Sequence, residues 1–289
     1  MEKQNLIIVR GGGDMATAVV HRLWSAGFSV LVLEHDRPAA IRRQVAVSEA
    51  VYEGNAVVEG LRAVRISDSA EIDAVLSGGD VPLMIDPEGA CIPALKPAAV
   101  IDAIMAKRNL GTNRSMAPLT VALGPGFAAG EDVDFVIETM RGHDLGRIIR
   151  TGSAQPNTGV PGMIDGYAAE RVIHAGWEGV IHNRSSIGDY VEQGQTIAVI
   201  ENAQGEHPVP ASISGLLRGL IREGYPVTKG FKIADIDPRR EEYKNCFTIH
   251  VFRKGKTWIS YEDAMRRLEK SRNGVQTHKQ RIQKKSKNL

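Results

Sequence analysis

The sequence of 289 residues contains little cysteine, few aromatic residues and no long apolar run. Its two cysteines, Cys91 and Cys246, lie far apart and outside any CxxC pair, which argues against a disulfide framework or a cysteine zinc site. No stretch approaches the roughly 18 apolar residues of a membrane span. The first residues lack the apolar region of a signal peptide. We therefore expect a cytoplasmic protein without a membrane partner.

A basic face is also lacking over most of the chain. The net charge is +2, but nine lysines and arginines and a single acid follow from Arg266 onward, so the rest of the chain is net acidic. Nucleic-acid binding would require a basic face on the folded part. We expect no nucleic-acid partner, and we interpret residues 241–289 as a C-terminal segment with a basic, disordered tail.

Glycine, in contrast, is abundant, with 30 residues. Over the first 150 residues, apolar runs alternate with patterns of helical period, and glycines follow the runs. This alternation predicts an α/β fold, a Rossmann-like doubly wound and mostly parallel sheet, over residues 1–165. The expected strands are 5–10, 28–36, 81–86 and 119–124, and the expected helices are 16–27, 97–109 and 133–142.

A repeat with an offset of 36 residues follows. Two similar halves predict a small all-β module over residues 171–240, resembling the barrel-sandwich hybrid of biotinyl and lipoyl carriers. No lysine occurs at 201–210 between the halves, so we expect packing or docking rather than a swinging arm. Beyond it, 247–259 is a candidate strand and 261–271 a candidate helix. The identical pairs are Ala175/Ala211, Gly179/Gly215, Gly188/Gly224, Val191/Val227, Gly194/Gly230, Ile197/Ile233, Ala198/Ala234 and Ile200/Ile236.

The first glycine loop follows the first strand and fits the pattern G-x-G-x-x-A. Gly11 is expected to make the tight turn, Gly13 to let the backbone approach a pyrophosphate, and Ala16 to pack the helix on the strand. The anion then faces the helix N-terminus. Gly12 completes the loop, and Asp14 is expected either to cap the helix or to contact a ligand.

Charged residues follow the second strand. Glu34, with Asp36 as the alternative, lies at the spacing that binds a ribose hydroxyl. Arg37, Arg42 and Arg43 are candidates for holding a 2′-phosphate or another anion, with a solvated loop as the alternative.

Other polar loops have equally open interpretations. Gly124 and Gly126 are expected to present N–H groups to an anion or simply to form a turn. Asp86 and Glu88 are candidates for a base or cation ligand, with capping as the alternative. The segment 141–144 contains His143 next to Asp144, but no nucleophile stands out. Ser153, Asn157 and Thr158 lie in the loop that follows and are read as turn formers.

Several phrases identify a family resemblance. The segments VRGGGDMATAVVHRLWSAGF, AIRRQVAVSEAVYEG, KPAAVIDAIMAKRNLGT, LGPGFAAGEDVDFVIETMRGHDLGRII and GLLRGLIREGYPVTKGFKIADIDPR resemble the YqeB-type accessory proteins of selenium-dependent molybdenum hydroxylase systems. The resemblance runs from about Leu6 to Ile249.

The resemblance implies a role in maturing or supplying a molybdenum hydroxylase, with that enzyme or its maturation machinery as partner. It assigns no reaction. Together with the glycine loop it suggests that the chain binds a molybdopterin dinucleotide or NAD(P), and that it is more an accessory protein than an enzyme. An NAD(P)-dependent oxidoreductase acting near Asp86 or His143 and a docking scaffold without ligand are the alternatives.

Overall fold

The computed structural model describes residues 6–240 together with residues 243, 246 and 248. All of them belong to one compact unit. The candidate helix at 261–271 and the basic tail lie outside these residues, as does the candidate strand at 247–259 apart from Thr248. Among the described residues, no helix combines the length and apolarity needed to cross a membrane.

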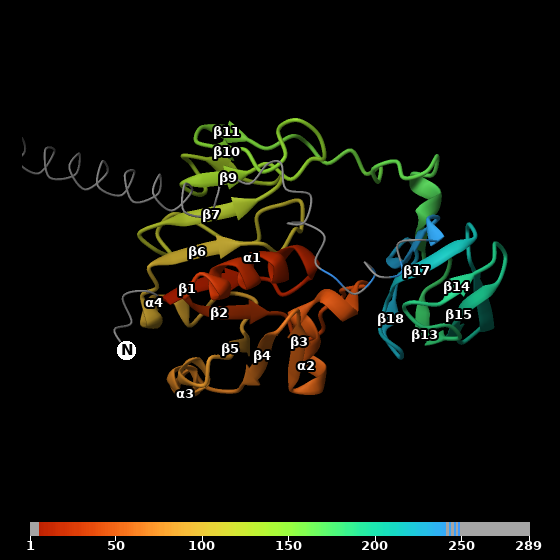
Figure 1. The fold of residues 1–289 in the computed structure, drawn as a ribbon, viewed down its shortest axis with the longest axis horizontal. Coiled ribbons are helices and arrows are strands. Elements are labelled where there is room, and N and C mark those ends of the chain that lie inside the picture. Colours follow the sequence, from red (N-terminus) through yellow and green to blue (C-terminus); the bar gives the residue numbers. More distant parts are fainter. Residues whose placement is uncertain (1–5, 241–242, 244–245, 247, 249–289) are drawn as a thin grey trace, which may run out of the picture. The chain divides into compact units, whose positions relative to one another are not determined.

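A large sheet organises the first part of the described chain, in the order β10-β9-β7-β6-β1-β2-β5-β4-β3 (Figure 1). The edge strands β3 and β10 pair antiparallel with their neighbours, and the other pairings are parallel. This confirms a mixed α/β fold with a large, mostly parallel sheet. The strands are β1 (Leu6–Arg10), β2 (Ser29–Glu34), β3 (Asn55–Val58), β4 (Leu61–Ile66), β5 (Val81–Ile85), β6 (Ala99–Asp102), β7 (Thr120–Leu123), β9 (Phe135–Ile137) and β10 (Ile148–Ile149).

The central strands and the first helix form as their patterns predict. β1 is buried along its whole length, because it lies between β2 and β6 and packs against α1. Helix α1 (Asp14–Ser25) packs against β1 and β2 through an apolar stripe that includes Val20 and Leu23. Shorter elements complete this part: α2 (Ala50–Glu53), α3 (Ile72–Ser77), α4 (Ile92–Leu95), and the two-stranded ribbon of β8 (Ala128–Ala129) and β11 (Gly152–Ser153).

Two expected helices are wrong. Residues 97–109 form β6 and an irregular loop, and residues 133–142 contain β9. In both places a short apolar run is compatible with a helix and with a strand. Which of the two forms depends on pairing with strands that are distant in the sequence. Val100 and Ile101 lie in β6 between β1 and β7, where ladder hydrogen bonds and burial on both sides favour the strand.

The strand order reverses at β1. The chain first builds β2, β5, β4 and β3 on one side of β1, then returns to place β6, β7, β9 and β10 on the other. In open α/β sheets, ligands bind outside the carboxyl ends of the strands at such a reversal. The loop after β1 and the loop after β6 meet there.

The β-module, which we define as residues 172–237, consists of two four-stranded antiparallel sheets. One has the order β12-β19-β17-β14, and the other β16-β15-β13-β18. The strands are β12 (Val172–His174), β13 (Gly179–Asn183), β14 (Tyr190–Val191), β15 (Thr196–Asn202), β16 (Gly205–Pro210), β17 (Gly215–Leu220), β18 (Pro226–Val227) and β19 (Lys232–Asp237).

The 36-residue repeat is visible in the strand order. Moving by one repeat takes β12 to β16, β13 to β17, β14 to β18 and β15 to β19, and so exchanges the two sheets. Each repeat supplies two strands to each sheet. Gly179 and Gly215 occupy matching places, because a Cβ on either would lie 2.9 Å from Cγ2 of Ile200 or Ile236, respectively. The two repeats share one apolar core.

Candidate functional site

Three loops meet at the carboxyl ends of β1, β6 and β7. They are residues 11–13, 103–108 and 124–126. A Cβ on Gly11 would lie 3.0 Å from the backbone of Ile104, and one on Gly126 would lie 2.6 Å from N of Arg108. Both glycines also have positive φ, of 100° and 108°. Glycine is therefore required at these positions for the loops to pack on one another.

Gly12 and Gly124 are also explained by contacts within the protein. The N–H of Gly12 donates to Glu34 Oε2 at 2.6 Å, and its carbonyl accepts from the N–H of Ser48 at 2.9 Å. A Cβ there would lie 3.1 Å from N of Ser48. A Cβ on Gly124, whose φ is 76°, would lie 2.7 Å from Oγ1 of Thr139.

Gly13 differs from the other four glycines. It has an ordinary φ of −65°, caps α1 without a side-chain hydrogen bond, and a Cβ added to it would meet nothing within 4 Å. Neither packing nor backbone conformation requires glycine at this position. The missing side chain leaves open space at the N-terminus of a 12-residue helix. Ala16, one turn into the helix, is fully buried as the pattern predicts.

Hydrogen bonds to Glu34 hold the first glycine loop in place. Its carboxylate accepts hydrogen bonds from the N–H groups of Gly12 and His35. Burial raises the pKa of Glu34, and these two bonds lower it in part. Its expected role toward a ribose hydroxyl stays a prediction, and in the structure its bonds hold the chain after β1 to the end of β2.

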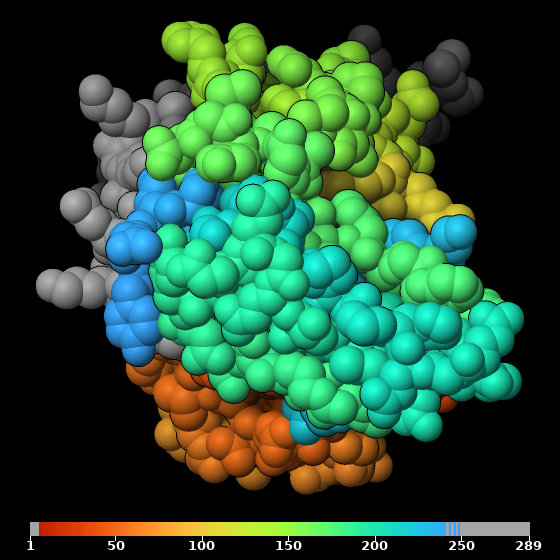
Figure 2. Space-filling view, turned by 90° about the vertical axis from the view of Figure 1, so that its right-hand side faces the viewer, coloured from red at the N-terminus to blue at the C-terminus, as the bar shows by residue number. Residues whose placement is uncertain are grey.

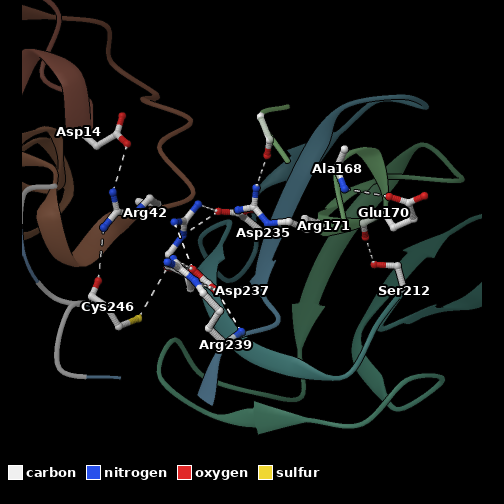
Figure 3. A network of polar contacts seen from close by, with 12 residues as sticks. Asp14, Arg42, Ala168, Glu170, Arg171, Ser212, Asp235, Asp237, Arg239 and Cys246 are labelled. Atoms are coloured by element: carbon white, nitrogen blue, oxygen red, sulfur yellow. Dashed lines mark hydrogen bonds and ion pairs between the residues drawn. The ribbon is translucent and has the colours of Figure 1, made fainter. Parts of the chain in front are cut away.

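Arg42 and Arg43, which follow β2, bind other groups of the protein. Arg42 lies 3.6 Å from Asp14 (Figure 3). It also donates to the carbonyl of Thr248 at 3.2 Å. Burial lowers the pKa of Arg42, and Asp14 opposes this shift. Arg43 donates through Nε to the carbonyl of Leu220, in the β-module. Their expected role in holding a ligand anion stays a prediction.

The structure contains a buried polar cluster beneath the loops that the sequence analysis did not predict. Arg10, at the end of β1, donates to Thr112 Oγ1 at 2.5 Å and to the carbonyl of Pro87 at 2.6 Å. Thr112 in turn donates to Asp102 at 2.5 Å, and Arg10 lies 4.0 Å from that carboxylate. Arg10 and Asp102 are both almost fully buried. Burial raises the pKa of Asp102, while bonds from Thr112 and Ile104 lower it in part. The cluster ties the loops after β5 and β6 to β1.

The loop after β6 adds a cation near the glycine loop. Met105 and Lys107 both adopt left-handed backbone conformations, with φ of 62° and 63°, which non-glycine residues rarely do. Burial lowers the pKa of Lys107, repulsion from Lys232 of the β-module lowers it further, and Asp14 raises it. The charges of Lys232 and Asp14 therefore act on Lys107. The sequence analysis did not predict this loop, because it assigned residues 97–109 to a helix.

The remaining candidates lie apart from one another. Asp86 accepts from the N–H groups of Ala90 and Cys91 just before α4. Partial burial raises its pKa, but these bonds outweigh burial and hold the pKa below its ordinary value. Asp144 pairs with Arg147 at 3.0 Å. Exposed residues at the other candidate positions are Glu88, His143, Ser153, Asn157 and Thr158. Within the described ranges, no group of three or more His, Cys, Asp or Glu is placed to hold a metal ion.

The fold and the three loops define an α/β protein in which three loops meet where the strand order reverses. The chain is 48% identical over 236 residues to a protein of Escherichia coli K12 named "Uncharacterized protein YqeB". It therefore belongs to the YqeB-type family. The match covers 82% of this chain and 43% of that protein, so the chain spans less than half the length of this relative. No family model matches.

Similarity to solved structures is weak. An ectoine utilization protein EutE (DoeB) of Ruegeria pomeroyi gives a TM-score of 0.27 at 10% identity, covering 81% of this chain and 86% of that chain. An aspartoacylase family protein of Mesorhizobium loti gives 0.26 at 11% identity, covering 81% and 84%. At these scores the likeness carries no argument about this chain.

Proposed function

We propose that this chain is an accessory or maturation protein for a selenium-dependent molybdenum hydroxylase and that it binds a nucleotide or dinucleotide-type ligand. Membership of the YqeB-type family supports the first part, since the sequence resembles accessory proteins of these systems. The second part rests on the loops at the carboxyl ends of β1 and β6.

The observation that carries the binding proposal is the open space at Gly13. Contacts within the protein account for Gly11, Gly12, Gly124 and Gly126, but nothing in the described chain accounts for Gly13. A phosphate in that space would face the first turn of α1, where the helix dipole favours an anion and where the N–H of Met15 donates to Asp14 Oδ1 at 2.9 Å. The charge of Lys107 would add to this attraction.

The finer fold assignment belongs to the same proposal. The reversal of strand order at β1 supports a Rossmann-like doubly wound sheet. The exchange of sheets between the two repeats supports a barrel-sandwich-hybrid-like module. In this interpretation the sheet binds the ligand, and the module packs or docks.

Calorimetric titration tests the ligand. Purified protein is titrated separately with molybdopterin cytosine dinucleotide, NAD(H), NADP(H), CTP and CDP. We expect the molybdopterin dinucleotide or NAD(P)(H) to bind in the micromolar range, about −8 kcal/mol. If none of the five ligands binds, the ligand proposal is wrong.

Co-purification tests the partner. A tagged chain, produced in an organism that makes a selenium-dependent molybdenum hydroxylase, is expected to retain that enzyme or its maturation proteins. A tagged chain lacking 172–237 should lose them if the module docks. The oxidoreductase alternative would need a base, and Asp86, with its lowered pKa and two backbone hydrogen bonds, does not favour it.

A further inference from the structure

Residues 41–43 join the β-module to the first glycine loop. The carbonyl of Ile41 accepts a hydrogen bond from the N–H of Leu220 at 2.8 Å, and the Ile41 side chain belongs to the apolar core of the module. The next residue, Arg42, lies 3.6 Å from Asp14, the first residue of α1 (Figure 3). The end of β17 is therefore held beside the N-terminus of α1.

Lys232, the first residue of β19, lies at this same end of the module. β19 pairs with β17 so that Ala234 lies opposite Leu220. The N–H of Ile221 then donates to the carbonyl of Ile233 at 2.8 Å, and Lys232 is the neighbour of Ile233 along the strand. Lys232 is exposed. The module thus places a lysine near its junction with the glycine loop.

Lys107 belongs to a second segment that reaches this place, the loop after β6. A Cβ on Gly126 would lie 2.8 Å from the carbonyl carbon of Lys107, so the loop is packed tightly in its left-handed conformation. Strained backbone of this kind persists only where its surroundings fix it, and it clusters at ligand sites. Figure 2 shows yellow residues, from the region of β6 and the loop after it, next to light-blue residues from the end of the β-module.

The two lysines carry charge that the protein leaves unneutralised. Among the described residues, neither Lys107 nor Lys232 forms an ion pair or a side-chain hydrogen bond. Asp14 is close, but it already pairs with Arg42. Repulsion from Lys232 lowers the pKa of Lys107 by more than the attraction of Asp14 raises it. An anion bound between the two lysines would remove this repulsion.

We infer that the β-module completes the ligand site, and that Lys232 and Lys107 together bind the second phosphate of a diphosphate whose first phosphate lies at Gly13. This inference rests on the proposed function and extends it, because it gives the module a part in binding the ligand. Nucleoside diphosphates and dinucleotides share the diphosphate group, so both belong to the expected ligand class. A ligand with a single phosphate would leave the lysines without an anion.

Calorimetry on the full chain tests the inference. The probe is inorganic pyrophosphate, and the control is sulfate, which is doubly charged but has a single tetrahedral group. We expect pyrophosphate to bind with Kd between about 10 and 500 μM, and sulfate at least tenfold more weakly. Absence of pyrophosphate binding at about 5 mM overturns the inference, as does sulfate that binds equally well.

Charge reversal locates the binding. Lys107→Glu and Lys232→Glu should each weaken pyrophosphate at least tenfold, whereas Lys232→Arg should keep Kd within about threefold. Lys229→Glu is the matched control, because Lys229 is an exposed lysine of the turn before β19 and its reversal changes the net charge equally. It should leave Kd within about twofold. Binding that Lys232→Glu leaves unchanged, or that Lys229→Glu weakens as much, overturns the inference.

The proposed function and this inference fail in different ways. If none of the five nucleotide-type ligands binds but pyrophosphate binds through both lysines, then the nucleotide assignment is wrong and the lysine site is supported. If a nucleotide-type ligand binds Lys107→Glu and Lys232→Glu as tightly as it binds the wild type, then the lysine site is wrong and the proposed function stands.

Discussion

Replacing Gly13 with asparagine separates ligand binding from helix stability, because the two respond in opposite directions. Gly13 is the N-cap of α1 and makes no side-chain capping bond. Asparagine is a better N-cap than glycine by a few tenths of a kcal/mol. Since a Cβ there meets nothing within 4 Å, the side chain enters without a clash. We expect the free energy of unfolding to rise by about 0.3 kcal/mol, or roughly 1 °C in Tm.

The same side chain would fill the space proposed for a phosphate. Loss of that contact and of the approach to the helix N-terminus should cost at least about 1.4 kcal/mol, a tenfold weaker Kd. Gly176→Asn is the matched control, because Gly176 also has open space around its Cβ position and no positive φ. Urea denaturation measures stability, and calorimetry with the ligand that binds wild-type protein measures Kd.

Two results would refute this reasoning. If Gly13→Asn lowers the free energy of unfolding by more than about 1 kcal/mol, then the protein itself requires glycine at that position. If the variant is stable and binds ligand as the wild type does, then the ligand lies elsewhere.

Three further predictions concern stability. Gly179→Ala and Gly215→Ala should each cost at least about 1–3 kcal/mol because a Cβ would lie 2.3 or 2.4 Å from the carbonyl oxygen of Glu201 or Asp237, and Gly179→Ala should cost more because Gly179 also has a positive φ, of 150°; urea denaturation measures both, and an equal or smaller cost for Gly179→Ala would contradict this. Glu34 has a folded-state pKa above 4.5, so its stabilising contribution is complete below that value and is lost as pH rises through the folded pKa. Stability relative to Glu34→Gln should therefore fall as pH increases from about 4 to 7, and a constant difference would contradict this. Arg10→Met should cost about 3–5 kcal/mol because it leaves Asp102 buried without its cation, and Asp102→Asn added to it should recover part of the loss; a double variant with no recovery would show that the charge does not matter.

The central strands and first helix could be predicted because their patterns are local. β1 and β2 are uninterrupted apolar runs, and α1 has a clear apolar stripe between Gly13 and Gly27. The 36-residue repeat predicted equivalent strands for the same reason. β6 and β9 could not be distinguished from helices, since their burial depends on neighbours distant in sequence.

Much of the candidate site also depended on contacts between distant segments. Glu34 and Gly12 were each identified from spacing, but the hydrogen bond that joins them appears only in the fold. Arg10 gave no signal, because a charged residue at the end of a strand is ordinarily exposed, and Asp102 lay inside a segment expected to be a helix. Lys107 was hidden inside an expected helix. Sequence identified the loops, and packing distinguished Gly13 from the other glycines.

The exchange of strands between the two repeats has a consequence for synthesis. β12 pairs with β19, and β13 pairs with β18, so neither sheet closes until the end of the module has left the ribosome. A nascent chain that ends inside the second repeat exposes the apolar faces of both half-built sheets at once. The large sheet of β1 to β10 can fold earlier, during synthesis, but the two sheets of the β-module must form together in a single late step.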